Sequence, residues 1–386
     1  MANTLSAFGL SADEAANLRL EISFSGPNAE IKSSELPIFE VMHKLPDIDL
    51  RDVNLYFFAF CLTGYSGEAQ VSKLQMRGTH ASLGYVFPMT FFRGEADIEG
   101  DWQKRYARVA FHKLINLSNI ANFAPDASID VLRDRRVFPD ELFPDNLSIV
   151  VAGLQNLDDA GVRVEQFKLM LLSQGITILD RYERDRKFFA EDKFSASVRL
   201  AALSPVLDED IEVIFQLLRQ SDADTSEAGR FLRLYQLIEY SIEKVYSWSL
   251  RALLGMEMSS WRLKKRLSAI TADRSRLGIL AAHCLHPTVN RAALDALAVT
   301  CRDLLKDLGE KLTGQETWDF LLYSVRNVVV HDQIKLIRTP NDYLPSLNDT
   351  LREVCLELTS NLFEPDLSKI WSLAKDEEQA QEAIVF

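Results

Sequence analysis

Three residues in the last third of the chain are of types that can cleave a phosphodiester bond. They are Arg326, Asn327 and His331, within the segment WDFLLYSVRNVVVH. A neutral imidazole can take the proton from a ribose 2′-hydroxyl, and an imidazolium can protonate the leaving 5′-oxygen. A guanidinium stabilises the charge that grows on the phosphate oxygens. These groups together predict RNA cleavage that requires no metal and no other cofactor.

Helical spacing places these side chains away from the core. Residues 315–331 have the pattern of an amphipathic helix. Its apolar stripe consists of Trp318, Leu322, Val325 and Val329. At about 100° per residue, Asn327 and His331 are neighbours one turn apart on the opposite face, and the long side chain of Arg326 can reach either of them. Two other interpretations stay open: an ordinary solvated helix face, and a strand over 328–337, because consecutive valines favour β structure.

The hexapeptide Arg-Asn-Val-Val-Val-His at 326–331 resembles the RNxxxH signature of HEPN domains, the higher eukaryotes and prokaryotes nucleotide-binding domains. Upstream, FLRLYQLIEY at 231–240 is similar to an early helix of many HEPN proteins, especially those found with bacterial anti-phage modules. The resemblance covers 208–362 and leaves the first 200 residues unexplained. It implies a helical domain that acts as a metal-independent endoribonuclease, in a homodimer whose two motif helices face each other.

The resemblance also implies roles for individual residues. His331 would be the general base or acid, Arg326 would bind the phosphate, and Asn327 would position one of the two. Glu239, on the early helix, would support the motif, although an exposed glutamate in an ordinary ion pair is the alternative.

The biological role that the resemblance implies is a toxin or anti-phage defence effector that cleaves host or viral RNA. Its N-terminal part would sense a phage-derived trigger or restrain the nuclease, and an antitoxin is a further candidate partner. Two other functions remain open, since a fold can host several. One is a non-catalytic HEPN-like module that binds nucleotide or RNA, and the other is a helical scaffold protein.

A basic run follows Trp261 and continues to Arg276, with Asp273 as its one acidic residue. The candidate RNA-binding residues are Arg262, Lys264, Lys265 and Arg266. In a chain with a net charge of −13, such a run predicts a local surface that guides an RNA backbone. A solvated helix face or a contact with an acidic partner domain is equally consistent with it.

Other catalytic classes find little support. The zinc-ligand types among His283, Cys284, His286 and Cys301 lack the spacing of a usual zinc site, so no metal is expected. The chain contains no GxxxxGK[ST], GxGxxG, HExxH or GxSxG. A P-loop NTPase, a dinucleotide enzyme, a zincin and an α/β-hydrolase are therefore all unsupported.

Composition favours a folded protein of the cytoplasm. Hydrophobic residues make up 47% and charged residues 26% of the 386 residues, a globular balance. The longest apolar run, 55–62, is far shorter than a membrane helix, and no secretory signal is expected at the start. The four cysteines form no CxxC pair, which predicts a reducing compartment and no contact with a membrane.

The order of strand and helix signals predicts an α+β protein with two domains. A mixed α+β domain is expected over 1–205, with a half-buried strand at 18–24. Its other expected strands are at 54–62, on both sides of Gly78 within 70–88, and at 148–151, 176–179 and 195–203. Its expected helices are at 34–45, at 101–123 and in a stretch that stops at Gly175.

After Pro205 helical periodicity takes over, which predicts an all-α HEPN-like helical bundle domain over 206–386. One helix is expected to start at Ser226, because serine followed by an acidic residue is a common helix start. The other expected helices are at 208–220, 259–270, 291–308, 315–331, 346–362 and 367–381.

Overall fold

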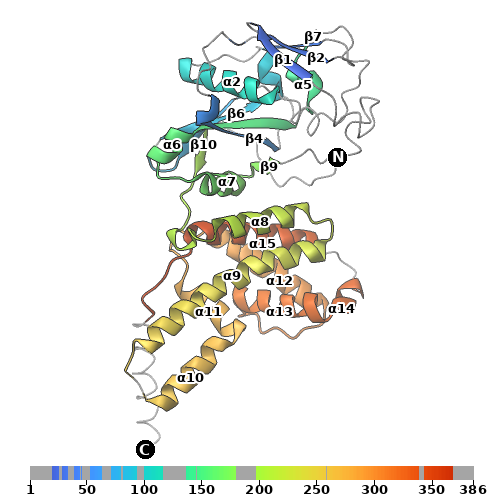
Figure 1. Cartoon of the computed structure of the whole chain (residues 1–386). Coiled ribbons are helices and arrows are strands. Elements are labelled where there is room, and N and C mark those ends of the chain that lie inside the picture. Colours follow the sequence, from blue (N-terminus) through green and yellow to red (C-terminus); the bar gives the residue numbers. More distant parts are fainter. Residues whose placement is uncertain are drawn as a thin grey trace, which may run out of the picture. The chain divides into compact units, whose positions relative to one another are not determined.

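The structure is a computed structural model of the chain. It describes residues 20–25, 28–33, 39–43, 45, 53–62, 71–79, 81–93, 100–115, 136–144, 146–179, 197–257, 259–338 and 343–367. The chain divides into two compact units, Met1–Ala202 and Leu203–Phe386. The first unit contains two sheets, and the second consists mainly of helices (Figure 1). The chain is therefore a mixed α+β protein, as the sequence predicts.

The larger sheet of the first unit has six strands in the order β10-β5-β6-β8-β4-β9. These are β4 (Tyr56–Leu62), β5 (Ser72–Met76), β6 (Ser82–Pro88), β8 (Leu147–Gly153), β9 (Thr177–Leu179) and β10 (Ser197–Leu200). All residues of β8 are buried, as expected of a continuous apolar run that is covered on both faces. The helix α2 (Gly100–Leu114) packs on β6, β8 and β4, and its buried side chains join those of the sheet in one core.

The smaller sheet corrects one helix prediction. Its order is β1-β2-β3-β7, with β1 (Leu20–Ser25), β2 (Asn28–Ser33), β3 (Phe39–Met42) and β7 (Arg136–Val137). The helix expected at 34–45 is wrong where the structure describes it, because Phe39–Met42 is a strand that pairs antiparallel with β2. Val41 is fully buried and β3 also pairs in parallel with the distant β7, so tertiary contacts outweigh the local pattern. Residues 34–38 lie outside the described ranges.

The strand predictions for this unit are confirmed within the described residues. The expected helix at 101–123 corresponds to α2, and its continuation beyond residue 115 lies outside those residues. Between β8 and β9 the chain forms α6 (Leu154–Asp159) and α7 (Val164–Ser173). Gly175 follows α7 with a φ of +75°, a left-handed conformation that glycine adopts without a steric cost, and this ends the helix where predicted.

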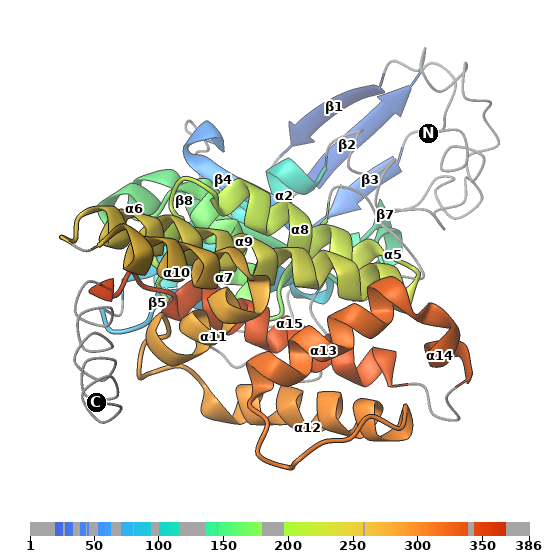
Figure 2. The ribbon, with the colours of Figure 1, turned by 90° about the horizontal axis from the view of Figure 1, so that it is seen from below.

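The second unit is built around one long helix. Its helices are α8 (Ile211–Ala223), α9 (Glu227–Leu254), α10 (Ser260–Thr271), α11 (Asp273–His283), α12 (Arg291–Asp307), α13 (Trp318–His331), α14 (Gln333–Arg338) and α15 (Leu344–Asn361). α9 contacts α8, α10, α11 and α15, while α13 contacts α11 and α12 (Figure 2). No helix within the described ranges combines the length and the apolar composition that crossing a bilayer requires.

The helices expected at 208–220, 259–270, 291–308, 315–331 and 346–362 are confirmed to within a few residues, and so is the helix expected to start at Ser226. Ser226 is the N-cap of α9 and accepts a hydrogen bond from the Gly229 amide at 3.3 Å. The alternative of a strand over 328–337 is wrong, because α13 continues to His331 and α14 follows it. α11 was not expected as a separate helix, and the helix expected at 367–381 lies almost entirely outside the described residues.

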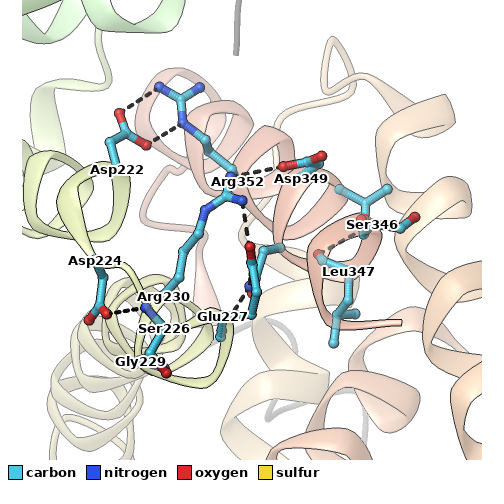
Figure 3. A network of polar contacts seen from close by, with 12 residues as sticks. Asp222, Asp224, Ser226, Glu227, Gly229, Arg230, Ser346, Leu347, Asp349 and Arg352 are labelled. Carbon is cyan, nitrogen blue, oxygen red and sulfur yellow. Dashed lines mark hydrogen bonds and ion pairs between the residues drawn. The ribbon is translucent and has the colours of Figure 1, made fainter. Parts of the chain in front are cut away.

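A buried polar network holds the ends of three helices together (Figure 3). Arg352 of α15 donates to both oxygens of Asp222 at the end of α8, at 2.9 and 3.1 Å. Arg230 of α9 donates to Asp349 at 2.9 Å. Asp224, the residue that follows α8, accepts a hydrogen bond from the Ser226 amide at 2.9 Å and packs closely on Gly229 in the first turn of α9. The network anchors the start of α9, the helix that also carries Tyr235 and Glu239.

Candidate functional site

The side chain of Arg326, a residue of α13, contacts three other side chains, two of which belong to α9. Its Nη2 donates to Oε1 of Glu239 at 3.5 Å, and its Nη1 donates to Oδ1 of Asn327 at 3.3 Å. Its guanidinium carbon lies 5.8 Å from the centre of the Tyr235 ring, within cation–π range. The side chain is 23% exposed, so part of it reaches solvent. The long distance to Glu239 makes this a weak ion pair that an anion could replace.

α9 provides a rigid support for Arg326. Tyr235 and Glu239 are four residues apart and so lie on one face of the helix. Phe231, one turn earlier, stacks on Tyr235 with ring centres 5.9 Å apart and is fully buried. Burial raises the pKa of the Tyr235 hydroxyl, so the ring next to the guanidinium stays neutral. Glu239, whose side chain is 43% exposed, supplies the one negative charge among these three side chains.

The apolar stripe of α13 is confirmed. Trp318, Leu322, Val325 and Val329 are all buried. Asn327 is half-buried and His331, the last residue of the helix, is exposed. Among the residues that the structure describes, none forms a hydrogen bond or an ion pair with the His331 side chain. The structure therefore brings Arg326, Asn327 and Glu239 together, and leaves His331 open to solvent at the end of the same helix.

A second arginine, Arg276 of α11, contacts α9 in a similar way. It binds Glu243 at 3.1 Å, and its guanidinium carbon lies 5.3 Å from the centre of the Tyr246 ring. Arg276 also contacts the carboxylate of Asp273, one turn earlier on its own helix. This arginine of the basic run is therefore held between two carboxylates.

The basic residues between Arg262 and Arg276 differ in how far they are exposed to solvent. Lys264 and Lys265 are exposed on α10, and Arg262 is half-buried. Arg266 is only 9% exposed, which corrects its assignment to an open RNA-binding surface. Its place in the 3.6-residue period puts it on the face of α10 that is turned toward the bundle. Arg274 of α11 lies 4.5 Å from the centre of the Phe320 ring on α13 and links the run to the motif helix.

The histidines and cysteines considered as zinc ligands have other surroundings. Within the described ranges, no three His, Cys, Asp or Glu side chains are grouped so as to hold a metal ion. Cys284 and Cys301 are fully buried, and burial raises the pKa of the Cys284 thiol to about 12. His286 shares a 2.7 Å hydrogen bond with the Thr288 hydroxyl. These groups are parts of the helical core and its connections.

The first unit contains one buried histidine with an unusual neighbour. The His43 ring packs edge-on against Phe111 with centres 4.2 Å apart, and its Nε2 contacts the Arg108 guanidinium. Burial, together with the charge of Arg108, lowers the pKa of His43 to about 3. A histidine that stays neutral inside the core has a structural role, and so does Arg108.

Comparisons of this chain with protein-family models, with curated proteins and with solved structures found no match. The assignment of a function therefore depends on the residues and their geometry.

Sequence reasoning missed Tyr235 as a contact of Arg326. The residue is part of the segment 231–240 that carries the resemblance, and it precedes Glu239 by one helical turn. Since a guanidinium is often stacked on an aromatic face, an aromatic residue one turn from a candidate carboxylate is a signal that could have identified it. The pairing of Arg276 with Glu243 had no such signal, because exposed charged pairs are common on helices.

Proposed function

We propose that this protein is a metal-independent endoribonuclease of the HEPN type that acts as a toxin or anti-phage defence effector. The observation that carries the proposal is the environment of Arg326. Its guanidinium lies on the Tyr235 ring and reaches Glu239 and Asn327, while the side chain remains partly exposed. An arginine oriented in this way, five residues before an exposed histidine on the same helix, suits phosphate binding beside a proton-transfer group.

In the proposed reaction, the neutral imidazole of His331 takes the proton of a ribose 2′-hydroxyl. The 2′-oxygen attacks the adjacent phosphorus, and the bond to the 5′-oxygen breaks as that oxygen receives a proton from an imidazolium, that of His331 in the second chain of the proposed dimer. Arg326 binds the non-bridging oxygens, where negative charge increases. The products are a 5′-hydroxyl and a 2′,3′-cyclic phosphate, which water can open to a 3′-phosphate. Glu239 is a positioning residue, because it acts through Arg326.

The proposed active form is a two-fold homodimer. Arg326 and His331 are separated by about 140° around α13, so the two side chains diverge within one chain. A second motif helix can bring its own histidine toward the first chain's arginine, and two-fold symmetry repeats the contact. Co-expressed Arg326→Ala and His331→Ala proteins should then recover part of the activity that each lacks alone. Mixed dimers that form and stay inactive would contradict the shared site.

The proposed cellular setting is the cytoplasm, where RNA is the substrate. A phage-derived trigger or an antitoxin would act through the first unit. The second candidate function is a non-catalytic module that binds RNA. One observation favours it: among the described residues, no side chain orients the His331 imidazole, whereas a catalytic base is usually held by a third group.

Cleavage of total RNA by the purified full-length protein in EDTA distinguishes these functions. His331→Ala should abolish cleavage. His283→Ala is the matched control, because His283 is also the exposed last residue of a helix, α11. Product ends are read by their resistance or sensitivity to phosphatase. Full activity of His331→Ala, equal effects of both substitutions, or a requirement for added magnesium would overturn the nuclease proposal.

A further inference from the structure

α10 differs in charge from the other helices of the protein. Among the described helices of ten or more residues, it is the one that contains no aspartate and no glutamate. It carries Arg262, Lys264, Lys265 and Arg266 in a chain whose net charge is −13. α10 lies at one end of the helical unit, where it contacts α9 and α11 (Figure 1). Since Arg266 is buried, the positive charge of the outer face comes from the exposed Lys264 and Lys265, and this face is a local positive surface on an acidic protein.

That outer face has a defined composition. Trp261 is 62% exposed, an unusual exposure for so large an apolar ring. Lys264, Lys265 and Ser268 follow it by three, four and seven residues, so they lie on the same side of the helix, and all three are exposed. The ammonium of Lys265 lies 5.4 Å from the centre of the indole ring. We name this surface, formed by Trp261, Lys264, Lys265, Ser268 and the exposed Thr271, the α10 platform; it spans about 15 Å of helix.

We propose that the α10 platform binds single-stranded RNA, with one unpaired base stacked on Trp261 and the flanking phosphates on Lys264 and Lys265. The proposal rests on the proposed nuclease function for the identity of the ligand as RNA. Proteins that bind single strands combine aromatic rings that stack on bases with cations that follow the backbone. The Ser268 hydroxyl adds a group that commonly contacts phosphate and sugar oxygens, whereas the Thr271 hydroxyl already donates to the Ser268 carbonyl at 2.7 Å. A duplex would not fit, because its bases are stacked inside the helix.

An anionic membrane is the other ligand class with a matching charge, and the structure favours RNA over it. A helix that lies on a membrane exposes a continuous apolar face. On α10 the apolar residues Leu263, Leu267 and Ile270 are half-buried or buried, and the platform carries one aromatic residue among lysines and hydroxyls. A single exposed indole with one ammonium group 5.4 Å from its centre suits one stacked base better than a lipid surface.

The test measures binding separately from cleavage. A fluorescein-labelled 12-nucleotide RNA without secondary structure is titrated with full-length protein that carries His331→Ala, and anisotropy gives the Kd. Trp261→Ala should raise the Kd by about 5- to 100-fold, the loss expected for one stacked base, and Trp261→Phe should restore most of the affinity. The matched control is Trp102→Ala, which removes a tryptophan of α2 that is 67% exposed and follows Asp101.

Two further measurements identify the ligand class. Lys264→Ala and Lys265→Ala should each reduce the slope of log Kd against log salt by about 0.7, the value for one single-strand phosphate contact. A 12-base-pair RNA duplex should bind more weakly and with no dependence on Trp261. An unchanged Kd in Trp261→Ala, or equal affinity for duplex and single strand, would overturn the proposal. If the protein binds phosphatidylserine vesicles in a way that depends on Trp261 and does not bind RNA, the platform is a membrane-binding surface and the proposal is wrong.

The experiments distinguish a failure of the nuclease proposal from a failure of the proposal that the α10 platform binds RNA. If cleavage in EDTA does not depend on His331 but RNA binding depends on Trp261, the platform is supported and the nuclease mechanism is wrong. If cleavage depends on His331 but the Kd for RNA does not change in Trp261→Ala, the platform proposal is wrong and the nuclease mechanism is supported.

Discussion

Arg326 and Arg276 contact the same helix in nearly the same way and differ in what else surrounds them. Each guanidinium lies against a tyrosine ring of α9 and binds a glutamate of α9, Glu239 for Arg326 and Glu243 for Arg276. Arg276 has a second carboxylate, Asp273, within contact. Arg326 has the neutral amide of Asn327 instead.

This difference indicates how a charged side chain can be oriented without being neutralised. Two carboxylates around Arg276 cancel its charge and leave little attraction for another anion. One distant carboxylate and an amide around Arg326 fix the direction of the guanidinium while the positive charge still attracts a phosphate. The comparison therefore predicts a structural role for Arg276 and a ligand-binding role for Arg326.

The largest expected effect concerns a third ion pair, Arg352–Asp222. It shows how much free energy of unfolding is lost when an arginine with a purely structural role loses its carboxylate. Arg352 and Asp222 are 7% and 1% exposed, so Asp222→Ala leaves a buried cation without its partner. We expect this substitution to lower the free energy of unfolding by about 3–5 kcal/mol. Glu239→Ala, at the partly exposed pair, should lower it by less than about 1 kcal/mol. Urea denaturation of both proteins measures the difference; equal losses would place Glu239 in the same structural class as Asp222.

The next effect separates directly the two arginines that contact α9, Arg326 of α13 and Arg276 of α11. Arg326→Ala should reduce the rate of RNA cleavage by about 100- to 1,000-fold, the range expected when one group that stabilises the transition state is removed. Arg276→Ala should leave the cleavage rate near the wild-type value and reduce the stability by about 1 kcal/mol. Cleavage kinetics and thermal unfolding are measured on both variants. A large loss of melting temperature in Arg326→Ala would show that the two arginines have the same role.

A smaller effect tests how Glu239 acts. Glu239→Gln keeps an oxygen that can accept from Arg326 and removes the negative charge. Since that charge repels a bound phosphate and also holds the guanidinium, we expect the KM for RNA and the kcat to fall together by about 2- to 5-fold, an energy typical of an exposed ion pair. Steady-state kinetics on a short RNA separates the two constants. A change in kcat alone or an increase in KM would contradict a positioning role.

The smallest effect concerns the loop that leads into α13. Desolvation raises the pKa of the Glu316 carboxyl, but hydrogen bonds from its own backbone, Thr313 and Gly314 outweigh this and lower it to about 2. A lowered pKa stabilises the folded protein fully above the ordinary value near 4.5, and this contribution is lost as the pH falls toward 2. Glu316→Gln should therefore lower the melting temperature at pH 7. The difference from wild type should shrink below about pH 4.5, and a difference independent of pH would contradict this origin.

The sequence predicted the features that depend on local periodicity. The buried stripe of α13 and the N-cap at Ser226 follow from spacing and residue type, and both are confirmed. The strand at Phe39–Met42 was mistaken for a helix, because it is held on one side by a parallel pairing with β7, which lies far away in the chain. The burial of Arg266 was missed for a related reason: a basic residue is assumed to be solvated unless the face that packs is known. The Arg326–Tyr235 contact joins residues far apart in the chain, so only the packing of α13 against α9 could establish it.

The length of α9 gives the proposed substrate a minimum size. Along this helix of 28 residues, Tyr235 lies about 28 Å from the last residue, Leu254, and α10 begins six residues after that end. A strand with stacked bases advances about 3.4 Å per nucleotide, so that length corresponds to about eight nucleotides. An oligonucleotide shorter than this could occupy the α10 platform or the surroundings of Arg326, but not both at once. If both proposals hold, the length of α9 would set the minimum number of nucleotides between the base stacked on Trp261 and the cleaved bond.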